Sequence, residues 1–154
     1  MNRTTFVKTL LLASFVGLSS TAAPTFAAGT PAEAEAMVKR AVTFIKEKGP
    51  DAAYSEFTNG SSFKDGDLYV SVFNMDGVNL AHGFNPKLVG KNLIDLKDVN
   101  GVELIKVQRA IAQGKGKGWT PVFQYMNPTT KRLQDKSSYV ERLNDTWVSV
   151  GAYK

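Results

Sequence analysis

The stretch that decides the fold of this chain reads Asp67-Leu68-Tyr69-Val70-Ser71-Val72-Phe73-Asn74-Met75-Asp76-Gly77-Val78-Asn79-Leu80-Ala81-His82-Gly83. Residues 68–74 and 78–82 alternate as β-strands do, and Asp76-Gly77 between them is a strong signal for a two-residue hairpin turn. The stretch therefore predicts an antiparallel hairpin. Its expected pairs are Met75 with Val78, Phe73 with Leu80, and Ser71 with His82.

The predicted hairpin has two apolar faces, because directly opposed residues share a face of the sheet. One face is expected to carry Tyr69, Ser71, Phe73, Leu80 and His82. The other is expected to carry Leu68, Val70, Val72 and Ala81. A helix can cover one of these faces. The second face needs another lid, or it lines a cavity.

A long helix is expected before the hairpin. Thr30-Pro31-Ala32-Glu33 has the layout of a capping box, with Pro31 at the first helical position. Apolar residues then recur at helical spacing as far as Ile45, and Gly49-Pro50 ends the helix after about 18 residues. Residues 51–57 are predicted to form a second, short helix, and residues 58–66 a loop.

The chain after the hairpin predicts one more helix and three more strands. Residues 83–97 are irregular, and Asp98 is expected to cap a helix that runs to Gln113. The predicted strands are residues 119–126, 133–143 and 146–153, the last two joined by Asn144-Asp145. The expected fold class is α+β, with a long N-terminal helix packed on one five-stranded antiparallel sheet.

Residues 1–27 have the pattern of a secretory signal peptide. Arg3 and Lys8 precede a short apolar run, and Thr25-Phe26-Ala27 places small residues where a signal peptidase cleaves. We expect cleavage after Ala27, which leaves residues 28–154 as a single periplasmic or secreted domain. The alternative is an uncleaved anchor, although the run is shorter than the roughly 20 residues that a spanning helix needs.

Composition excludes several classes of site. The 154 residues include no cysteine and one histidine, so a thiolate zinc site, a cysteine nucleophile and a multi-histidine metal site are excluded. The formal net charge is +5. Removing Arg3 and Lys8 with the signal peptide lowers it to about +3, too mild a bias to indicate nucleic-acid binding.

The hairpin stretch resembles the central hairpin of the single Cache domains (type 2), which are extracellular sensory domains with a PAS-like fold. Four further fragments are similar to the family and follow in its order. They are Asn85-Pro86-Lys87-Leu88-Val89-Gly90-Lys91-Asn92-Leu93, Asp95-Leu96-Lys97-Asp98-Val99-Asn100-Gly101, Tyr125-Met126-Asn127-Pro128 and Lys136-Ser137-Ser138-Tyr139-Val140. The resemblance covers residues 32–154.

The resemblance implies a long helix along one face of the sheet and a ligand pocket over the other. It also implies recognition of a small organic acid or a similar metabolite by the sensory part of a chemoreceptor or sensor kinase. The chain ends at Lys154 without a second membrane segment or a signalling module. We therefore interpret it as a free-standing exported form that reports to a membrane receptor or sensor kinase.

Six side chains are candidates for ligand binding: Tyr69, His82, Trp119, Tyr125, Lys136 and Tyr139. A cation and a phenol hydroxyl suit a carboxylate, but alternation puts Lys136 and Tyr139 on opposite faces of their strand. Trp119 and Tyr125 stand at even spacing, so they are expected to share a face. For each candidate, core packing or solvation is the alternative.

No catalytic residue, metal ligand or cofactor is predicted, because no nucleophile–base pair and no ligand cluster is present in the sequence. The sequence therefore favours a binding protein over an enzyme. The competing hypothesis is an interaction module without a ligand, which dimerises through its N-terminal helix.

Overall fold

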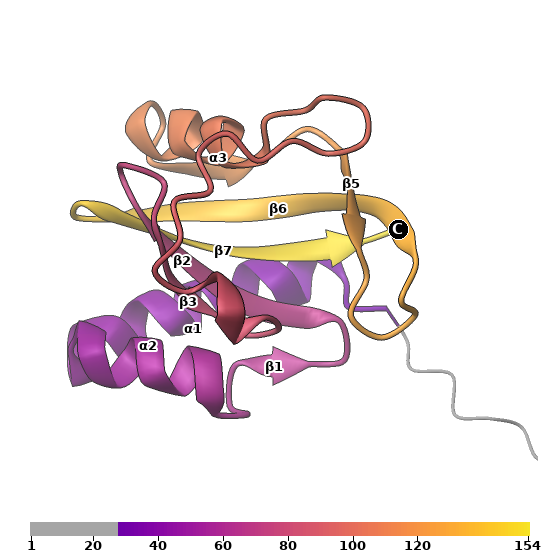
Figure 1. Ribbon diagram of the computed structural model, residues 1–154. Coiled ribbons are helices and arrows are strands. Elements are labelled where there is room, and N and C mark those ends of the chain that lie inside the picture. Colours follow the sequence, from indigo (N-terminus) through magenta and orange to yellow (C-terminus); the bar gives the residue numbers. More distant parts are fainter. Residues whose placement is uncertain (1–27) are drawn as a thin grey trace, which may run out of the picture.

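The computed structural model describes residues 28–154 as one α+β unit (Figure 1). The predicted signal peptide, residues 1–27, lies outside the described residues. Among the described residues, no helix combines the length and the apolar character that crossing a membrane requires.

Helix α1 (Pro31–Lys48) begins with the predicted capping box. The Thr30 hydroxyl accepts a hydrogen bond from the Glu33 amide, and the Glu33 carboxylate accepts one from the Thr30 amide. Gly49, with a φ of 82°, ends the helix, and α2 (Pro50–Asn59) follows directly. Both predicted N-terminal helices are confirmed.

The strands form one antiparallel sheet in the order β1-β2-β7-β6-β4, with β3 also paired to β2 and β5 to β6. The central hairpin joins β6 and β7, and β2 pairs with β7. The seven strands within the described residues are β1 (Lys64–Asp65), β2 (Leu68–Asn74), β3 (Asn79–His82), β4 (Lys117–Trp119), β5 (Phe123–Met126), β6 (Leu133–Leu143) and β7 (Thr146–Tyr153).

The strand count differs from the predicted five for two reasons. Lys64–Asp65 adds a short strand to the edge of β2. The predicted strand 119–126 is interrupted at Pro121, which has no amide hydrogen to give to the ladder. Its two ends pair separately with β6, as β4 and β5.

The turn between β2 and β3 is longer than predicted. The Asn74 amide donates to the Val78 carbonyl, and the Asn74 side chain accepts from the Asp76 and Val78 amides. The loop is therefore Met75–Gly77, with Gly77 at a φ of 86°. The predicted Met75–Val78 pair does not form.

The longer turn shifts the register of β3. Ser71 pairs with His82 as predicted, but Phe73 lies opposite Asn79 rather than Leu80, with an irregularity between Val72 and Phe73. The extra residue turns Leu80 to the face that packs on α1 and α2. The predicted place of Leu80 beside Tyr69 is therefore wrong.

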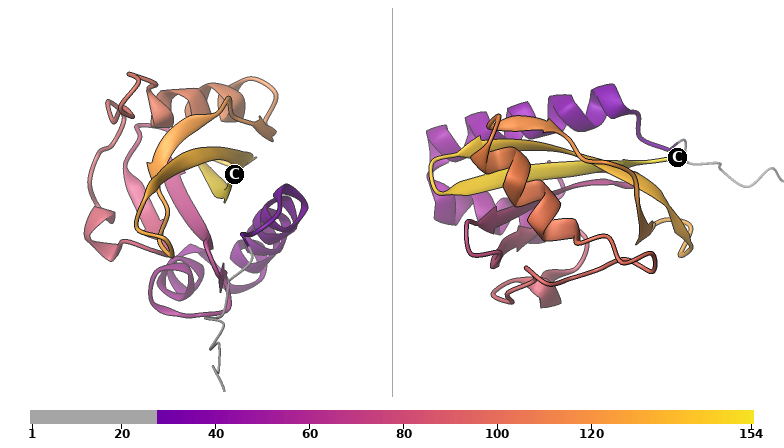
Figure 2. Two further views of the ribbon diagram at one scale, coloured as in Figure 1. Left: turned by 90° about the vertical axis from the view of Figure 1, so that its right-hand side faces the viewer. Right: turned by 90° about the horizontal axis from the view of Figure 1, so that it is seen from above.

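The sheet separates two apolar clusters. Figure 2 shows helices on both faces of the sheet. Helices α1 and α2 cover one face, where Val70, Val72 and Val148 are buried. Helix α3 (Leu104–Gln113) and the loop that contains the 3-10 helix η1 (Pro86–Leu88) lie over the other face, as Figure 1 also shows.

Helix α3 ends at Gln113 as predicted but begins at Leu104, with Glu103 and not Asp98 at its N-cap. The Asp98 carboxylate instead accepts hydrogen bonds from the amides of Asn100, Val102 and Gln124. Asp98 thus closes a turn in the loop and attaches that loop to β5.

Candidate functional site

A cavity lies between the sheet and the layer formed by α3 and the η1 loop, on the face opposite α1. Its floor comes from β2, β3, β6 and β7, and its volume is about 40 Å³. That is room for a few water molecules or a very small ligand. Its lining includes Leu88, Leu93, Leu96, Leu104, Ile105 and Phe123 on the apolar side, and Ser71, Ser138, Ser149 and Gln108 on the polar side.

Lys136 on β6 brings an amine into this cavity, and its side chain is 5% exposed. Lys136 Nζ lies 2.8 Å from Tyr69 Oη and 3.0 Å from Tyr153 Oη. The ring centroid of Tyr125 is 5.0 Å from the same nitrogen. Lys136 takes part in none of the ion pairs found within residues 28–154.

Burial lowers the pKa of Lys136 to about 7, because the ammonium has lost its water and the charge of Asp67 offsets only part of that loss. Burial also raises the pKa of Tyr69 and Tyr153, so both hydroxyls keep their protons at neutral pH. The Tyr153 hydroxyl donates to the Met126 carbonyl at 2.9 Å. Lys136 must therefore donate to Tyr153 Oη.

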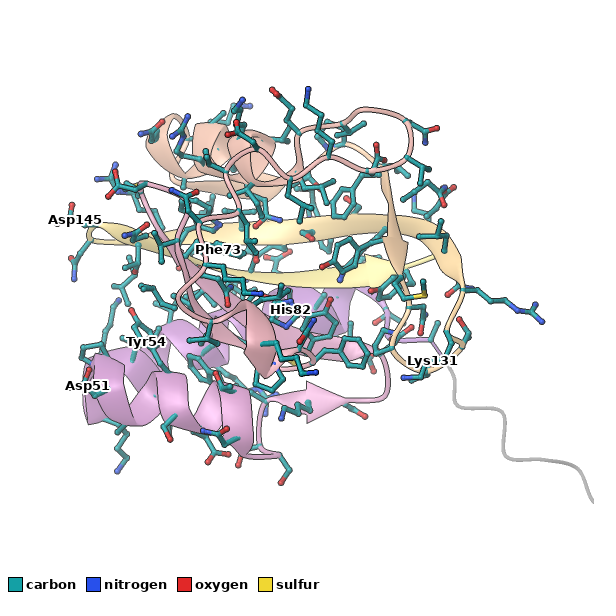
Figure 3. The ribbon with its side chains drawn as sticks, in the orientation of Figure 1. Asp51, Tyr54, Phe73, His82, Lys131 and Asp145 are labelled. Carbon is teal, nitrogen blue, oxygen red and sulfur yellow. The ribbon has the colours of Figure 1, made fainter. Side chains whose placement is uncertain are left out.

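His82 at the end of β3 faces the same cavity (Figure 3). Its Nδ1 accepts hydrogen bonds from the amides of Asn85, at 2.9 Å, and Phe84, at 3.3 Å. Nδ1 therefore carries no proton, and in the neutral ring the proton is on Nε2. Burial, with a smaller effect of the Lys136 charge, lowers the pKa of His82 to about 4. At neutral pH His82 is an uncharged N–H donor.

Gly151 on β7 has no side chain, and this leaves room for the Lys136 side chain on the floor of the cavity. A Cβ at this position would overlap Lys136 Cε and approach Ser138 Oγ to 2.9 Å. Its φ is not positive, so the need for glycine is steric rather than conformational. Gly151 fixes where the amine of Lys136 can lie.

The comparisons with known proteins match this architecture. A family model described as Single Cache domain 2 matches residues 30–153, nearly all of the described chain. The chain belongs to this family. The sensory fold that the sequence fragments implied is thereby confirmed.

Solved Cache structures share the fold. A methyl-accepting chemotaxis protein from Vibrio parahaemolyticus is similar over 79% of this chain and 86% of that one, with a TM-score of 0.68 and 30% identity. A second structure, described as a Cache chemosensory domain that recognises carboxylic acids, aligns over 77% of this chain and 84% of that one, with a TM-score of 0.62. Its identity is 20%, so it supports the fold alone.

A curated relative is the sensor histidine kinase MctS from Rhizobium johnstonii, 34% identical over 93 residues. The match covers 58% of this chain but 19% of the kinase. This Cache domain therefore corresponds to a small part of that relative.

The structure brings four of the six predicted site residues together at the cavity: Tyr69, His82, Tyr125 and Lys136. Trp119 and Tyr139 do not line it. They pair across β4 and β6 on the opposite face, with ring centroids 5.5 Å apart. Tyr139 belongs to the core beneath α1, and Trp119 is 36% exposed.

The predicted common face of Trp119 and Tyr125 is wrong, because the interruption at Pro121 resets the alternation between β4 and β5. The predicted opposition of Lys136 and Tyr139 is confirmed. Lys136 lines the cavity, and Tyr139 packs on the α1 side.

Sequence analysis missed Tyr153 and Gly151. The signal was present, because the Asn144-Asp145 turn fixes the pairs Lys136 with Tyr153 and Ser138 with Gly151. Extending the hairpin register from that turn would have placed both residues beside Lys136.

Proposed function

We propose that this Cache domain binds a small monocarboxylate in the cavity, with Lys136 as its counter-ion. The observation that carries the proposal is the buried Lys136 amine, which forms no ion pair within residues 28–154 and whose charge the more distant Asp67 offsets only in part. A buried ammonium without a partner is costly, and a ligand carboxylate supplies the missing charge.

The charges and the size of the cavity favour a short monocarboxylate. Lys136 is the one cation among the residues that line the cavity, since His82 is neutral at pH 7. A second carboxylate would have no partner there. The volume of about 40 Å³ favours a very small ligand, and Phe73 and Leu96 are among the apolar residues that line the cavity.

Two further donors complete the site in this proposal. His82 Nε2–H is fixed as a donor by the backbone amides that occupy Nδ1. Tyr69 Oη lies 2.8 Å from Lys136 Nζ and can turn its hydrogen towards a carboxylate oxygen. The Tyr125 ring, 5.0 Å from the same nitrogen, closes one side.

We assign the domain a sensory role outside the cytoplasm, in which its ligand state is reported to a membrane receptor or sensor kinase. The support is the family, together with the chemotaxis protein and the histidine kinase that share its sequence. In that role the domain needs no catalytic group of its own.

A thermal-shift panel tests the ligand class. Acetate, propionate and pyruvate are compared with succinate, acetamide and ethylamine at pH 6.5. A ligand that binds the folded state alone, present at about 100 times its dissociation constant, adds about 2.7 kcal/mol of stability. We expect a rise in Tm with the monocarboxylates. A rise with ethylamine or acetamide, and none with the acids, would contradict the proposal.

The competing proposal is a ligand-free module that dimerises through α1. The exposed side of α1 forms a groove with Phe63, in which Arg40 lies 5.6 Å from the Phe63 ring centroid. That groove also carries Lys39 and Glu47, so it is not a plain apolar face. A concentration-dependent mass in sedimentation, together with no shift in the ligand panel, would favour this alternative.

A further inference from the structure

We propose a second chemistry for this cavity: Lys136 forms a reversible imine with a small aldehyde or 2-oxo acid. The structural basis is a buried amine held between two phenol hydroxyls at a cavity, with no acidic side chain in contact with it. Imine formation does not depend on the binding of a monocarboxylate, so it goes beyond the function proposed above.

The hydrogen bonds around Lys136 can all be satisfied by a neutral amine. Tyr153 donates to the Met126 carbonyl, so Lys136 Nζ donates one N–H to Tyr153 Oη. The Tyr69 hydrogen is then free to point at the lone pair of Nζ across 2.8 Å. This chain of donors runs in one direction, and the second N–H of the neutral amine is free to point into the cavity.

The surroundings of Lys136 also keep the neutral amine populated. The titratable groups that face it are Tyr69, His82, Tyr125, Tyr153 and, more distantly, Asp67. The three tyrosines and His82 are uncharged at pH 7. Because the pKa of Lys136 is about 7, roughly half of the molecules carry an uncharged, nucleophilic amine at neutral pH.

The reaction balances without an oxidant or a reductant. The Nζ lone pair attacks the carbonyl carbon, a C–N bond forms, and the C=O π electrons move to the oxygen. One amine proton reaches that oxygen through the Tyr69 hydroxyl and gives a carbinolamine. The second amine proton then joins the hydroxyl group, the C–O bond breaks, and water leaves as C=N forms. Tyr69 acts as the proton relay and ends in its original state.

Two other lysines of the same protein show how an ion pair changes the reactivity of an amine. Lys39 pairs with Glu35, and Lys106 pairs with Asp95 and Glu103. These carboxylates raise the pKa of both lysines, so both stay protonated and unreactive at neutral pH. Lys136 should therefore be the preferred site of a carbonyl reagent, although it is the most buried of the three.

Trapping with acetaldehyde tests the proposal, since this probe has a carbonyl group and no carboxylate. The full chain is treated with acetaldehyde and cyanoborohydride at pH 6, 7 and 8, and peptides are mapped by mass spectrometry. We expect an ethyl group on Lys136 at least about tenfold faster than on Lys39 or Lys106 at pH 7. The rate should rise from pH 6 and level off above the Lys136 pKa. Tyr69→Phe should slow it severalfold.

Lys136→Arg is the control variant, because it keeps a cation and cannot form an imine. Labelling of Lys136 no faster than of Lys39 and Lys106, in protein shown to be folded by circular dichroism, would overturn the imine. Acetate binding measured on the same sample separates the two proposals. Acetate binding without labelling overturns the imine alone, and labelling without acetate binding overturns the monocarboxylate alone. Protection of Lys136 by excess acetate supports both.

Discussion

Lys136, the proposed counter-ion of the ligand, costs the fold stability instead of contributing to it. Its pKa of about 7 lies below the value near 10.4 of an unfolded chain, so the unfolded state holds more protons between these pH values. The burial of Lys136 therefore lowers the free energy of unfolding below pH 7. This destabilisation decreases as the pH rises towards 10.

We therefore expect Lys136→Met to stabilise the protein at pH 6, by about 1–4 kcal/mol, because a buried unpaired charge is replaced by an apolar chain of similar length. Urea unfolding of both proteins at pH 6 and pH 9 measures this difference. The advantage of the variant should shrink at pH 9. An equal or larger advantage at pH 9 would show that the buried charge is not its cause.

The affinity for acetate should also follow the protonation of Lys136. A carboxylate binds the ammonium and not the neutral amine, so the affinity should be constant below about pH 6. It should fall by about tenfold per pH unit above the Lys136 pKa of about 7. Calorimetric titration with acetate from pH 5.5 to 8.5 measures this dependence. Constant affinity across that range would mean that Lys136 does not pair with the ligand.

Gly151→Ala should displace the Lys136 side chain without unfolding the sheet, because the added Cβ would overlap Lys136 Cε. We expect acetate affinity to fall by about tenfold or more, with a loss of stability of about 1–3 kcal/mol from overpacking. Gly60→Ala is the matched control. Gly60 has a φ of −80°, and the atoms nearest to an added Cβ there belong to the Glu56 carboxylate, the far end of a flexible side chain. Unchanged acetate affinity in Gly151→Ala would contradict the steric role of this glycine.

Among the elements, those with complete local signals were predictable. Helix α1 carries its own capping box and glycine stop, and the β6–β7 hairpin carries a two-residue turn with its register intact. The β2–β3 turn was not predictable from Asp76-Gly77 alone, because the Asn74 side chain closes a longer loop. The start of α3 was missed because Asp98 bonds to β5 instead of capping the helix.

The completeness of the local signal also explains which site residues were placed on the correct face. Alternation assigns a residue to a face only while the strand is uninterrupted. It therefore placed Tyr69, His82 and Lys136 correctly at the cavity. It failed at Trp119, where Pro121 breaks the strand before Tyr125. The hairpin register places Gly151 near Lys136, but spacing does not encode the conformation that brings Lys136 Cε over this glycine.

The capping box of α1 can be tested as an element. Thr30→Ala removes the hydroxyl that accepts the Glu33 amide and should lower the free energy of unfolding by about 1 kcal/mol. Thr43→Ala, on the exposed side of the same helix, should be neutral or slightly stabilising. Urea unfolding measures both. Acetate affinity should stay unchanged in both variants, because α1 lies on the other face of the sheet; a loss in Thr30→Ala would contradict that separation.

In the whole molecule, α1 and α2 lie on one face of the sheet and α3 lies on the other (Figure 2). Helices α1 and α2 bury one face, and the cavity lies under α3 and the η1 loop. His82 connects the cavity to the surface. Its Nδ1 accepts a hydrogen bond from the amide of Phe84, and the Phe84 ring is partly exposed beneath Lys131. A ligand held at Nε2 would thus act on a residue that fixes the path of the η1 loop.

The role of Lys136 as counter-ion can be tested by calorimetric titration of acetate at pH 6. The titration compares the wild-type protein with Lys136→Met and with the surface control Lys106→Met. We expect saturable one-site binding to the wild type and to Lys106→Met. For Lys136→Met we expect a loss of at least about 30-fold in affinity, since truncating one partner of a buried charge pair costs about 2–5 kcal/mol. Equal affinity in all three proteins, each shown to be folded, would contradict the assignment of Lys136 as the carboxylate's counter-ion.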